Sequence, residues 1–216
     1  MIRPKALLLD LDGTLVDSRD DIADALNRAL AVHGLATLER ARIYPMIGDG
    51  ARVLVTRALA AGGEAAVKGA SVDAVLDTLK SDYAANACVH TKLLDGATEI
   101  FALALPCAVI TNKPRVVTEP LLAALGLAPA ALWAADGPLK PAPDAVITTC
   151  AKLGIDPREA WMIGDGPQDV AAGKAAGAFS VAVLGNIAVH EDVLAAKPDL
   201  VVTSLREIIS SVNRLL

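Results

Sequence analysis

Two aspartates near the amino terminus have the spacing of a working carboxylate pair. Asp10 and Asp12 come directly after the apolar run at residues 7–9 and are followed by Gly13 and Thr14. Two carboxylates held this close repel each other unless a cation lies between them or one of them takes up a proton. The pattern therefore indicates a buried strand whose end delivers acids to a site for a cation or for proton transfer.

Three other residues could bind an oxyanion beside this pair. Thr111 and Asn112 follow a second short apolar run and can donate hydrogen bonds. Lys140 is a cation in a stretch that contains Pro141 and Pro143, which restrict the backbone. Together these side chains would neutralise a phosphoryl group, and electrostatic positioning of this kind is the larger part of catalysis in phosphoryl transfer.

The carboxylates also suit a metal ion. Asp10, Asp12 and Asp165 supply hard anionic oxygens, the ligand type that Mg²⁺ prefers. One carboxylate of the first pair could act as the nucleophile and form an aspartyl-phosphate that water then hydrolyses. The other could protonate the leaving oxygen and later deprotonate the water. The sequence thus predicts Mg²⁺-dependent phosphoryl transfer.

Alternating strand and helix patterns position these groups. Apolar segments of strand length lie at residues 5–10, 107–110, 132–135, 160–163, 180–184 and 199–202. Amphipathic segments between them predict helices, so we expect an α/β fold with a parallel sheet and helices on both faces. Asp10, Thr111 and Asp165 each fall at the carboxyl end of an expected strand, which is the edge where open α/β sheets bind ligands.

One part of the chain lacks strand patterns. The sequence between residues 16 and 86 contains no convincing strand and predicts helices instead, at 22–32, 51–61 and 72–83. Ser18 has the properties of an N-cap for the first of these helices. We therefore expect an all-helical insert at residues 17–86, within a core formed by residues 1–16 and 87–216.

The composition argues against several other classes of protein. The net charge is −5 and there is no basic block, which disfavours nucleic acid as the main partner. The longest charge-free stretches are interrupted by proline or glycine and are too short for a spanning helix, so no membrane segment is expected. The three cysteines form no CxxC pair and indicate reduced core thiols. We expect a soluble cytoplasmic protein that is a monomer or a homodimer.

Taken in order, these motifs resemble those of the haloacid dehalogenase superfamily of phosphotransferases. The four motifs of that superfamily are matched by residues 10–14, by Thr111 and Asn112, by Lys140, and by Gly164, Asp165 and Asp169. The resemblance covers the whole chain. It implies a Rossmann-like core with an inserted helical cap of the C1 type, to which the insert at residues 17–86 corresponds. Gly166 departs from the pattern, since serine or threonine usually follows the fourth-motif aspartate.

The resemblance also implies a role for each motif residue. Asp10 would be the nucleophile, and Asp12 would be the general acid and base. Mg²⁺ would be bound by the Asp10 carboxylate, the Asp12 backbone carbonyl and the Asp165 carboxylate. The phosphoryl group would be held by Thr111, Asn112 and Lys140, and the site would be supported by Asp169.

Within the superfamily the sequence is most similar to the phosphoglycolate phosphatase group, on residues 10–18, 48–55 and 199–202. This similarity implies a small phosphorylated metabolite as the partner, with 2-phosphoglycolate as the substrate. Other capped phosphotransferases stay open, namely a sugar-phosphate phosphatase, a pyrophosphatase or a hexose-phosphate mutase. A catalytically silent binding protein with the same fold is a further alternative, and the intact acids at positions 10 and 12 argue against it.

The cap would then supply substrate specificity. Asp49 lies in a Gly-Asp-Gly turn that is followed by Arg52. If this turn faces the active site, Arg52 or Arg42 could pair with a substrate carboxylate, because a guanidinium binds a carboxylate through two hydrogen bonds. The alternative is that Asp49 caps the next helix and that Arg52 is a surface charge.

Overall fold

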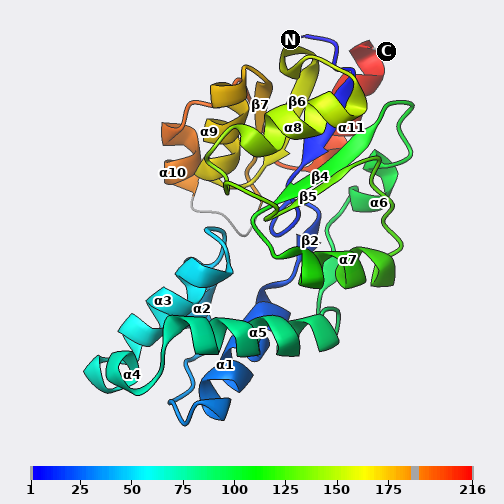
Figure 1. Ribbon diagram of the computed structural model, residues 1–216. Coiled ribbons are helices and arrows are strands. Elements are labelled where there is room, and N and C mark those ends of the chain that lie inside the picture. The colour runs from blue at the N-terminus through cyan, green and yellow to red at the C-terminus, as the bar shows by residue number, and fades with distance from the viewer. Residues whose placement is uncertain (1, 186–189, 216) are drawn as a thin grey trace.

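A six-stranded parallel sheet forms the centre of the protein in the computed structural model (Figure 1). The structure describes residues 2–185 and 190–215, so residues 1, 186–189 and 216 of the expected core lie outside the described part. The strand order is β5-β4-β1-β6-β7-β8, and all neighbouring pairs are parallel. The strands are β1 (Ala6–Leu9), β4 (Cys107–Thr111), β5 (Leu132–Ala134), β6 (Ala160–Gly164), β7 (Phe179–Val183) and β8 (Leu200–Val202).

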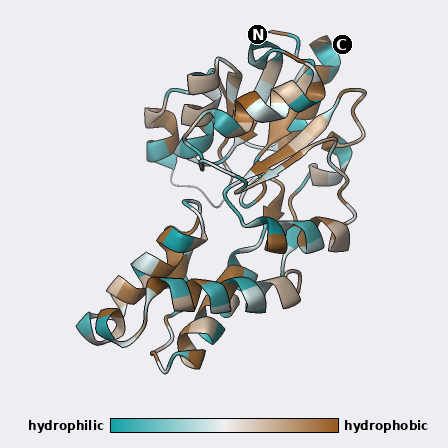
Figure 2. Cartoon of the chain, in the orientation of Figure 1, coloured by the Kyte–Doolittle hydropathy of each residue, from teal (hydrophilic) through white to brown (hydrophobic). Residues whose placement is uncertain are grey.

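Both faces of this sheet are covered, which explains why β1 is apolar without alternation. Leu7 and Leu9 belong to a cluster that contains residues of α7 (Arg115–Ala124) and α11 (Leu205–Leu215). Leu8 points to the opposite face, among residues of α8 (Asp144–Leu153) and α9 (Pro167–Ala176). Figure 2 shows the apolar strands in the centre of the core and polar residues on the helices around them. The expected α/β fold with helices on both faces is confirmed.

The insert after β1 forms a helical cap that lies below the core in Figure 1. Its helix α5 runs along α7 of the core, so the two units are in direct contact. Leu26, Leu54, Val55 and Leu79 are buried within the cap or where it meets the core. The cap contains α1 (Arg19–Val32), α2 (Arg40–Ile43), a 3₁₀ turn η1 (Tyr44–Met46), α3 (Ala51–Ala61), α4 (Glu64–Gly69) and α5 (Val72–Ala85). The all-helical character of the insert is confirmed, while its exact limits at residues 17–86 stay a prediction.

The two chain segments that join cap and core pair with each other. Strand β2 (Val16–Asp17) runs antiparallel to β3 (Lys92–Leu93). The segment that leads from the cap back into the core is also bound to the start of α1. The Asp21 carboxylate accepts hydrogen bonds of 2.8–3.0 Å from the backbone amides of residues 89–91. The prediction of no strand from residue 16 to about residue 86 is therefore wrong only at the boundary of the insert, where β2 has two residues, too few to show a pattern.

The remaining differences from the expected elements are at short helices. The sequence predicts a helix over residues 97–105, but α6 (Ala97–Ile100) is a single turn. The chain must turn toward β4, and Pro106 disfavours a helical conformation in the residue before it. Two short helices, α4 and α10 (His190–Ala195), were not predicted, because six residues carry too little periodicity. A 3₁₀ turn η2 (Pro157–Glu159) precedes β6.

Among the described helices, none combines the length and the apolar character that crossing a membrane requires.

Candidate active site

Three neighbouring strands deliver the predicted polar residues to one edge of the sheet. β1 lies between β4 and β6, so Asp10, Thr111 and Asp165 stand side by side at the carboxyl ends of adjacent strands. Thr14, in the turn after Asp12, donates a hydrogen bond of 3.3 Å to Asp165. The sheet therefore joins residues that are more than 150 positions apart in the sequence, as their places at strand ends predict.

Lys140 reaches the same point from the loop before α8. Its ammonium group lies 2.6 Å from Asp10 Oδ1 and 2.5 Å from Asp169 Oδ1, and its side chain is only 2% exposed. Burial alone would lower the pKa of Lys140, but Asp10 and Asp169 outweigh burial and raise it. Lys140 is therefore a buried cation beside the predicted nucleophile.

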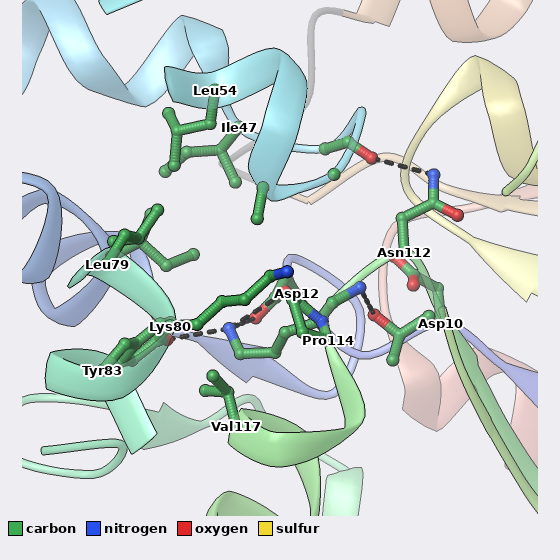
Figure 3. A pocket seen from close by; sticks show the side chains of 16 residues that line it. Asp10, Asp12, Ile47, Leu54, Leu79, Lys80, Tyr83, Asn112, Pro114 and Val117 are labelled. Atoms are coloured by element: carbon green, nitrogen blue, oxygen red, sulfur yellow. Dashed lines mark hydrogen bonds and ion pairs between the residues drawn. The ribbon is translucent and has the colours of Figure 1, made fainter. Parts of the chain in front are cut away.

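Asn112 holds the Lys140 loop in place. Its side-chain amide donates a hydrogen bond of 3.0 Å to the Lys140 carbonyl and accepts one of 2.8 Å from the Lys140 backbone N–H. The same amide nitrogen also donates to the Gly48 carbonyl of the cap, at 3.2 Å (Figure 3). In this structure the Asn112 side chain thus positions Lys140 and joins the cap to the core, whereas the sequence suggested a direct hydrogen bond to phosphate.

A cluster of carboxylates adjoins this lysine. One oxygen each of Asp10, Asp165 and Asp169 lies within 4.8 Å of the others. Burial raises the pKa of Asp10 to about 7, the charge of Asp169 adds to the effect, and Lys140 opposes it. Burial, together with the charge of Asp10, also raises the pKa of Asp165 well above its ordinary value. Three buried carboxyl groups share one lysine, so ionisation of all three would leave more negative charge than that lysine neutralises.

This donor set fits Mg²⁺. Hard carboxylate oxygens are its preferred ligands, and a divalent cation would relieve the repulsion among them. The backbone carbonyl of Asp12 accepts no hydrogen bond from any described residue, so this oxygen is free to be a further ligand. Gly13 is required beside the cluster because its φ is +90° and a Cβ there would lie 2.0 Å from Asp165 Oδ2.

Asp169 is held within the cluster by the start of α9. Its second carboxylate oxygen accepts a hydrogen bond of 3.0 Å from the Gly166 backbone N–H, and its first accepts from Lys140. Gly164 leaves the space that this side chain fills, since a Cβ on Gly164 would lie 2.2 Å from the Asp169 carboxyl carbon. Asp169 thus contacts Lys140 directly and orients it toward Asp10.

The Asp12 carboxylate points away from this cluster and has different partners. It accepts hydrogen bonds from Lys113 Nζ at 2.9 and 3.2 Å and from Ser18 Oγ at 2.5 Å. Lys113 in turn donates to the Tyr83 hydroxyl of cap helix α5, at 2.7 Å. Burial alone would lower the pKa of Lys113, but Asp12 and Tyr83 outweigh burial and raise it. Asp12 is thus held by a charged lysine from the core and a hydroxyl from the cap.

Sequence reasoning missed most of this second group. Lys113 directly follows Thr111 and Asn112, and this adjacency could have identified it as a residue of the site. Nothing in the sequence distinguishes Tyr83 from an ordinary core aromatic residue. Ser18 does precede α1, but its hydroxyl makes no capping hydrogen bond and binds Asp12 instead. The expectation that Ser18 is the N-cap residue of α1 is therefore confirmed by its position, although its side chain makes no capping hydrogen bond.

A small cavity lies between the catalytic acids and the cap (Figure 3). It has a volume of about 60 Å³ and lies between α5, the loop at residues 47–51 and the ends of β1 and β4. Its polar end contains Asp10, Asp12, Thr111, Asn112 and Lys113. Its cap side is mostly apolar and is formed by Ile22, Ile47, Ala51, Leu54 and Leu79. A second cavity of about 220 Å³ adjoins Asp12 on the side of Asp165, Arg19 and Tyr44.

The arginines expected to bind a substrate carboxylate do not line either cavity. Arg52 is 61% exposed and pairs with Asp73 at 2.5 Å. Arg42 donates to the Ala61 carbonyl on the cap surface. Asp49 does line the second cavity, where its carboxylate lies 2.6 Å from Arg57. The turn faces the active site through the backbone of residues 48–50 and not through the Arg52 side chain.

Comparisons with known proteins agree with this geometry. The sequence model of the haloacid dehalogenase-like hydrolases matches residues 4–177. Over 211 residues the chain is 36% identical to a phosphoglycolate phosphatase of Rhodospirillum rubrum, with 88% of each chain covered. Over 224 residues it is 30% identical to an N-acetylmuramic acid 6-phosphate phosphatase of Pseudomonas aeruginosa, with 100% of this chain and 97% of the relative covered.

A solved structure shows the same architecture. The crystal structure of a predicted phosphoglycolate phosphatase from Haemophilus somnus superposes with a TM-score of 0.87 at 27% identity, over 98% of this chain and 99% of the other. The parallel sheet, the inserted helical cap and the acids at the strand ends define the class of protein. The chain belongs to the haloacid dehalogenase-like hydrolase family, which confirms the resemblance carried by its motifs.

Proposed function

We propose that this hydrolase is a Mg²⁺-dependent phosphatase that cleaves 2-phosphoglycolate through an aspartyl-phosphate on Asp10. The observation that carries the proposal is the convergence of Asp10, Lys140 and Asp165 at one sheet edge, with Asp12 held apart beside the cavity. The phosphoglycolate phosphatases among its relatives support the substrate. The intact acids and the buried lysine argue against a catalytically silent binding protein.

Mg²⁺ would be held by the carboxylates of Asp10 and Asp165 and by the backbone carbonyl of Asp12. When bound, it would offset the negative charge of the carboxylates and of the phosphoryl group. Lys140 would bind a phosphoryl oxygen, with Asp169 and Asn112 holding its ammonium group and its backbone in place. Thr111, which lines the same cavity, would donate to another phosphoryl oxygen.

The chain's own residues then account for both halves of the reaction. An Asp10 oxygen attacks phosphorus, the ester bond breaks, and Asp12 as the general acid gives a proton to the leaving alkoxide. Asp12 is then a carboxylate and removes a proton from the water that attacks the aspartyl-phosphate. Phosphate leaves, and Asp10 is regenerated. Lys113 and Ser18 hold the Asp12 carboxylate beside the cavity during both steps.

The substrate is tested by a comparison of phosphate esters. With Mg²⁺ present, we expect kcat/KM for 2-phosphoglycolate to exceed that for glucose 6-phosphate by at least about tenfold, because the cavity beside Asp10 is small. The measurement is phosphate release across the panel at one pH and one Mg²⁺ concentration. Equal or faster turnover of the larger esters would contradict the choice of substrate but not the phosphatase chemistry.

A sugar phosphate is the second candidate, and two observations favour it. One relative is an N-acetylmuramic acid 6-phosphate phosphatase that aligns with the whole of this chain. The second cavity, lined by Asp12 and by the polar side chains of Arg19, Asp49 and Gln168, provides room for a larger alcohol. N-acetylmuramic acid 6-phosphate therefore belongs in the same panel. The roles suggested for Asp49 and Arg52 stay predictions.

The carboxylate cluster predicts how Mg²⁺ and pH act on stability. In the metal-free folded protein the pKa of Asp10 is about 7, whereas its ordinary value is 3.8. The contribution of Asp10 to the free energy of unfolding is therefore fully present below about pH 4, and it is lost as the pH rises through 7 and Asp10 ionises in the folded protein. We expect Tm in EDTA to fall between pH 5 and pH 8, and we expect Mg²⁺ to raise Tm more at pH 8 than at pH 5.

Thermal unfolding measured by circular dichroism, with and without Mg²⁺ at the two pH values, checks this prediction. Asp10→Asn is the matched control, because it removes the titrating carboxyl and should reduce the pH dependence of the Mg²⁺ effect. A rise in Tm on adding Mg²⁺ that is equal at both pH values, or larger at pH 5, would contradict it.

A further inference from the structure

The cavity beside the catalytic acids contains a cap residue that the mechanism does not use. Lys80 of α5 lines this cavity together with Asp10, Asp12 and Thr111. Figure 3 shows its side chain extending from α5 into the cavity, with the ammonium group turned toward Asp12. Tyr83, one helical turn later, faces the same space and binds Lys113, as the i, i+3 spacing on a helix requires.

Lys80 differs from Lys113 and Lys140 because it forms no ion pair with a carboxylate of the described residues, although it shares the cavity with Asp12. Lys113 is paired with Asp12, and Lys140 is paired with Asp10 and Asp169. No ion pair between described residues includes Lys80. The other cap cations that pair with a carboxylate do so outside this cavity: Arg19, Arg28, Arg40, Arg52, Arg57 and Lys68.

The surroundings of Lys80 favour an anionic ligand. Ile47, Leu54, Leu79 and Val117 line the same cavity, so water is partly displaced and the local dielectric is low. An attraction between opposite charges is stronger in such surroundings than in open water. Lys140 and Thr111 are already assigned to the phosphoryl group, so the ammonium group of Lys80 is placed for a second anionic group on the same substrate.

We infer that Lys80 is a specificity-determining residue that binds a carboxylate on the alcohol portion of the substrate. The preferred substrates are then small phosphomonoesters with a carboxylate close to the ester oxygen, because Lys80 lines the same cavity of about 60 Å³ as Asp10 and Thr111. This inference rests on the proposed function and names a residue that recognises the substrate. It assigns to Lys80 the task that the sequence had suggested for Arg52 or Arg42.

The test compares two substrates that differ in the carboxylate. Ethyl phosphate has the same chain length as 2-phosphoglycolate, with a methyl group where the carboxylate would be. For wild-type enzyme we expect kcat/KM to be about 10- to 100-fold higher for 2-phosphoglycolate, since a hydrogen bond to a charged group contributes in that range. Lys80→Met should lower kcat/KM for 2-phosphoglycolate by a similar factor and should change that for ethyl phosphate less than about twofold.

Two further variants control for effects on folding and on overall charge. Lys80→Arg keeps the positive charge and should retain most of the preference for 2-phosphoglycolate. Lys68→Met removes a cap lysine that pairs with Glu64 on the surface, and it should leave both substrates unchanged. All variants are compared by Tm, so that a loss of folded protein is separated from a loss of recognition.

Three outcomes would overturn the inference. Equal losses for both substrates in Lys80→Met would show that Lys80 acts on the phosphoryl group or on cap position. No loss for either substrate would show that it does not bind the carboxylate. Equal wild-type kcat/KM for the two esters would remove this inference while the phosphatase chemistry stands, whereas wild-type turnover of neither ester would overturn the proposed function as well.

Discussion

Asp10→Asn is expected to abolish phosphatase activity, with kcat/KM reduced by at least about 10⁴-fold for every phosphomonoester tested. The amide keeps the volume of the side chain but is neutral, so it cannot attack phosphorus to form a stable acyl phosphate. It also removes one of the carboxylates that would hold Mg²⁺. Both effects act on the reacting centre, and phosphate release in the presence of saturating Mg²⁺ measures their sum.

The control for this variant is the same substitution on the cap surface. Asp77 is exposed on α5, so Asp77→Asn should retain full activity. Asp10→Asn should remain folded, because it relieves repulsion with Asp165 and Asp169 when metal is absent. Turnover by Asp10→Asn within about tenfold of wild type would show that another group is the nucleophile.

Lys140→Met is expected to have the second largest effect and to act on both activity and stability. It removes the cation that contacts Asp10 and Asp169, and the loss of one such electrostatic group typically lowers kcat by about 10²- to 10³-fold. Breaking a buried ion pair by removing one partner also costs about 3–5 kcal/mol of stability. Urea unfolding in EDTA measures the second effect without the compensating charge of a metal ion.

Lys152→Met is the matched control, because Lys152 is an exposed lysine of α8 in the helix that follows the Lys140 loop. It should leave both activity and unfolding free energy nearly unchanged. If Lys140→Met kept kcat/KM within about threefold of wild type, Lys140 would have no part in binding the phosphoryl group, however close it lies to Asp10.

The residues at strand ends could be predicted because two simple regularities place them. A charge-free run of strand length identifies β1, β4 and β6, and parallel order brings Asp10, Thr111 and Asp165 to the same edge. Lys140 was found by its order among the motifs, and the structure brings it into contact with Asp10. Helix α3, at residues 51–61, was predicted with its observed bounds because a glycine stands next to each end.

The contacts between cap and core could not be predicted in this way. Lys113 and Asp12 are 101 positions apart in the sequence. Tyr83 accepts a hydrogen bond from Lys113 only because α5 lies along the core. No periodicity of the sequence fixes how two units dock. Asn112 shows a related limit, since an amide side chain can donate to a ligand or to a backbone carbonyl, and the sequence does not distinguish the two.

Arg52 illustrates how one helical position decides a role. Ala51 and Leu54 of α3 line the cavity, and successive residues of a helix are turned by about 100°. Arg52 therefore points to the surface, where it meets Asp73. The sequence identified a segment of the cap that lines the cavity, but the register of α3 turns the Arg52 side chain away from it, whereas Lys80 on α5 lines the cavity and is the residue proposed for the charged contact.

The central claim is that Asp10 carries the phosphoryl group between the two half-reactions. It is tested most directly by an acid quench during turnover of the best phosphomonoester of the panel, followed by peptide mass spectrometry. We expect one phosphoryl group on the peptide that contains Asp10. Borohydride reduction of the aspartyl-phosphate would convert residue 10 to homoserine, and the Asp10→Asn variant should give neither product. A phosphoryl group on a different residue, or none while wild-type enzyme turns over, would contradict the mechanism.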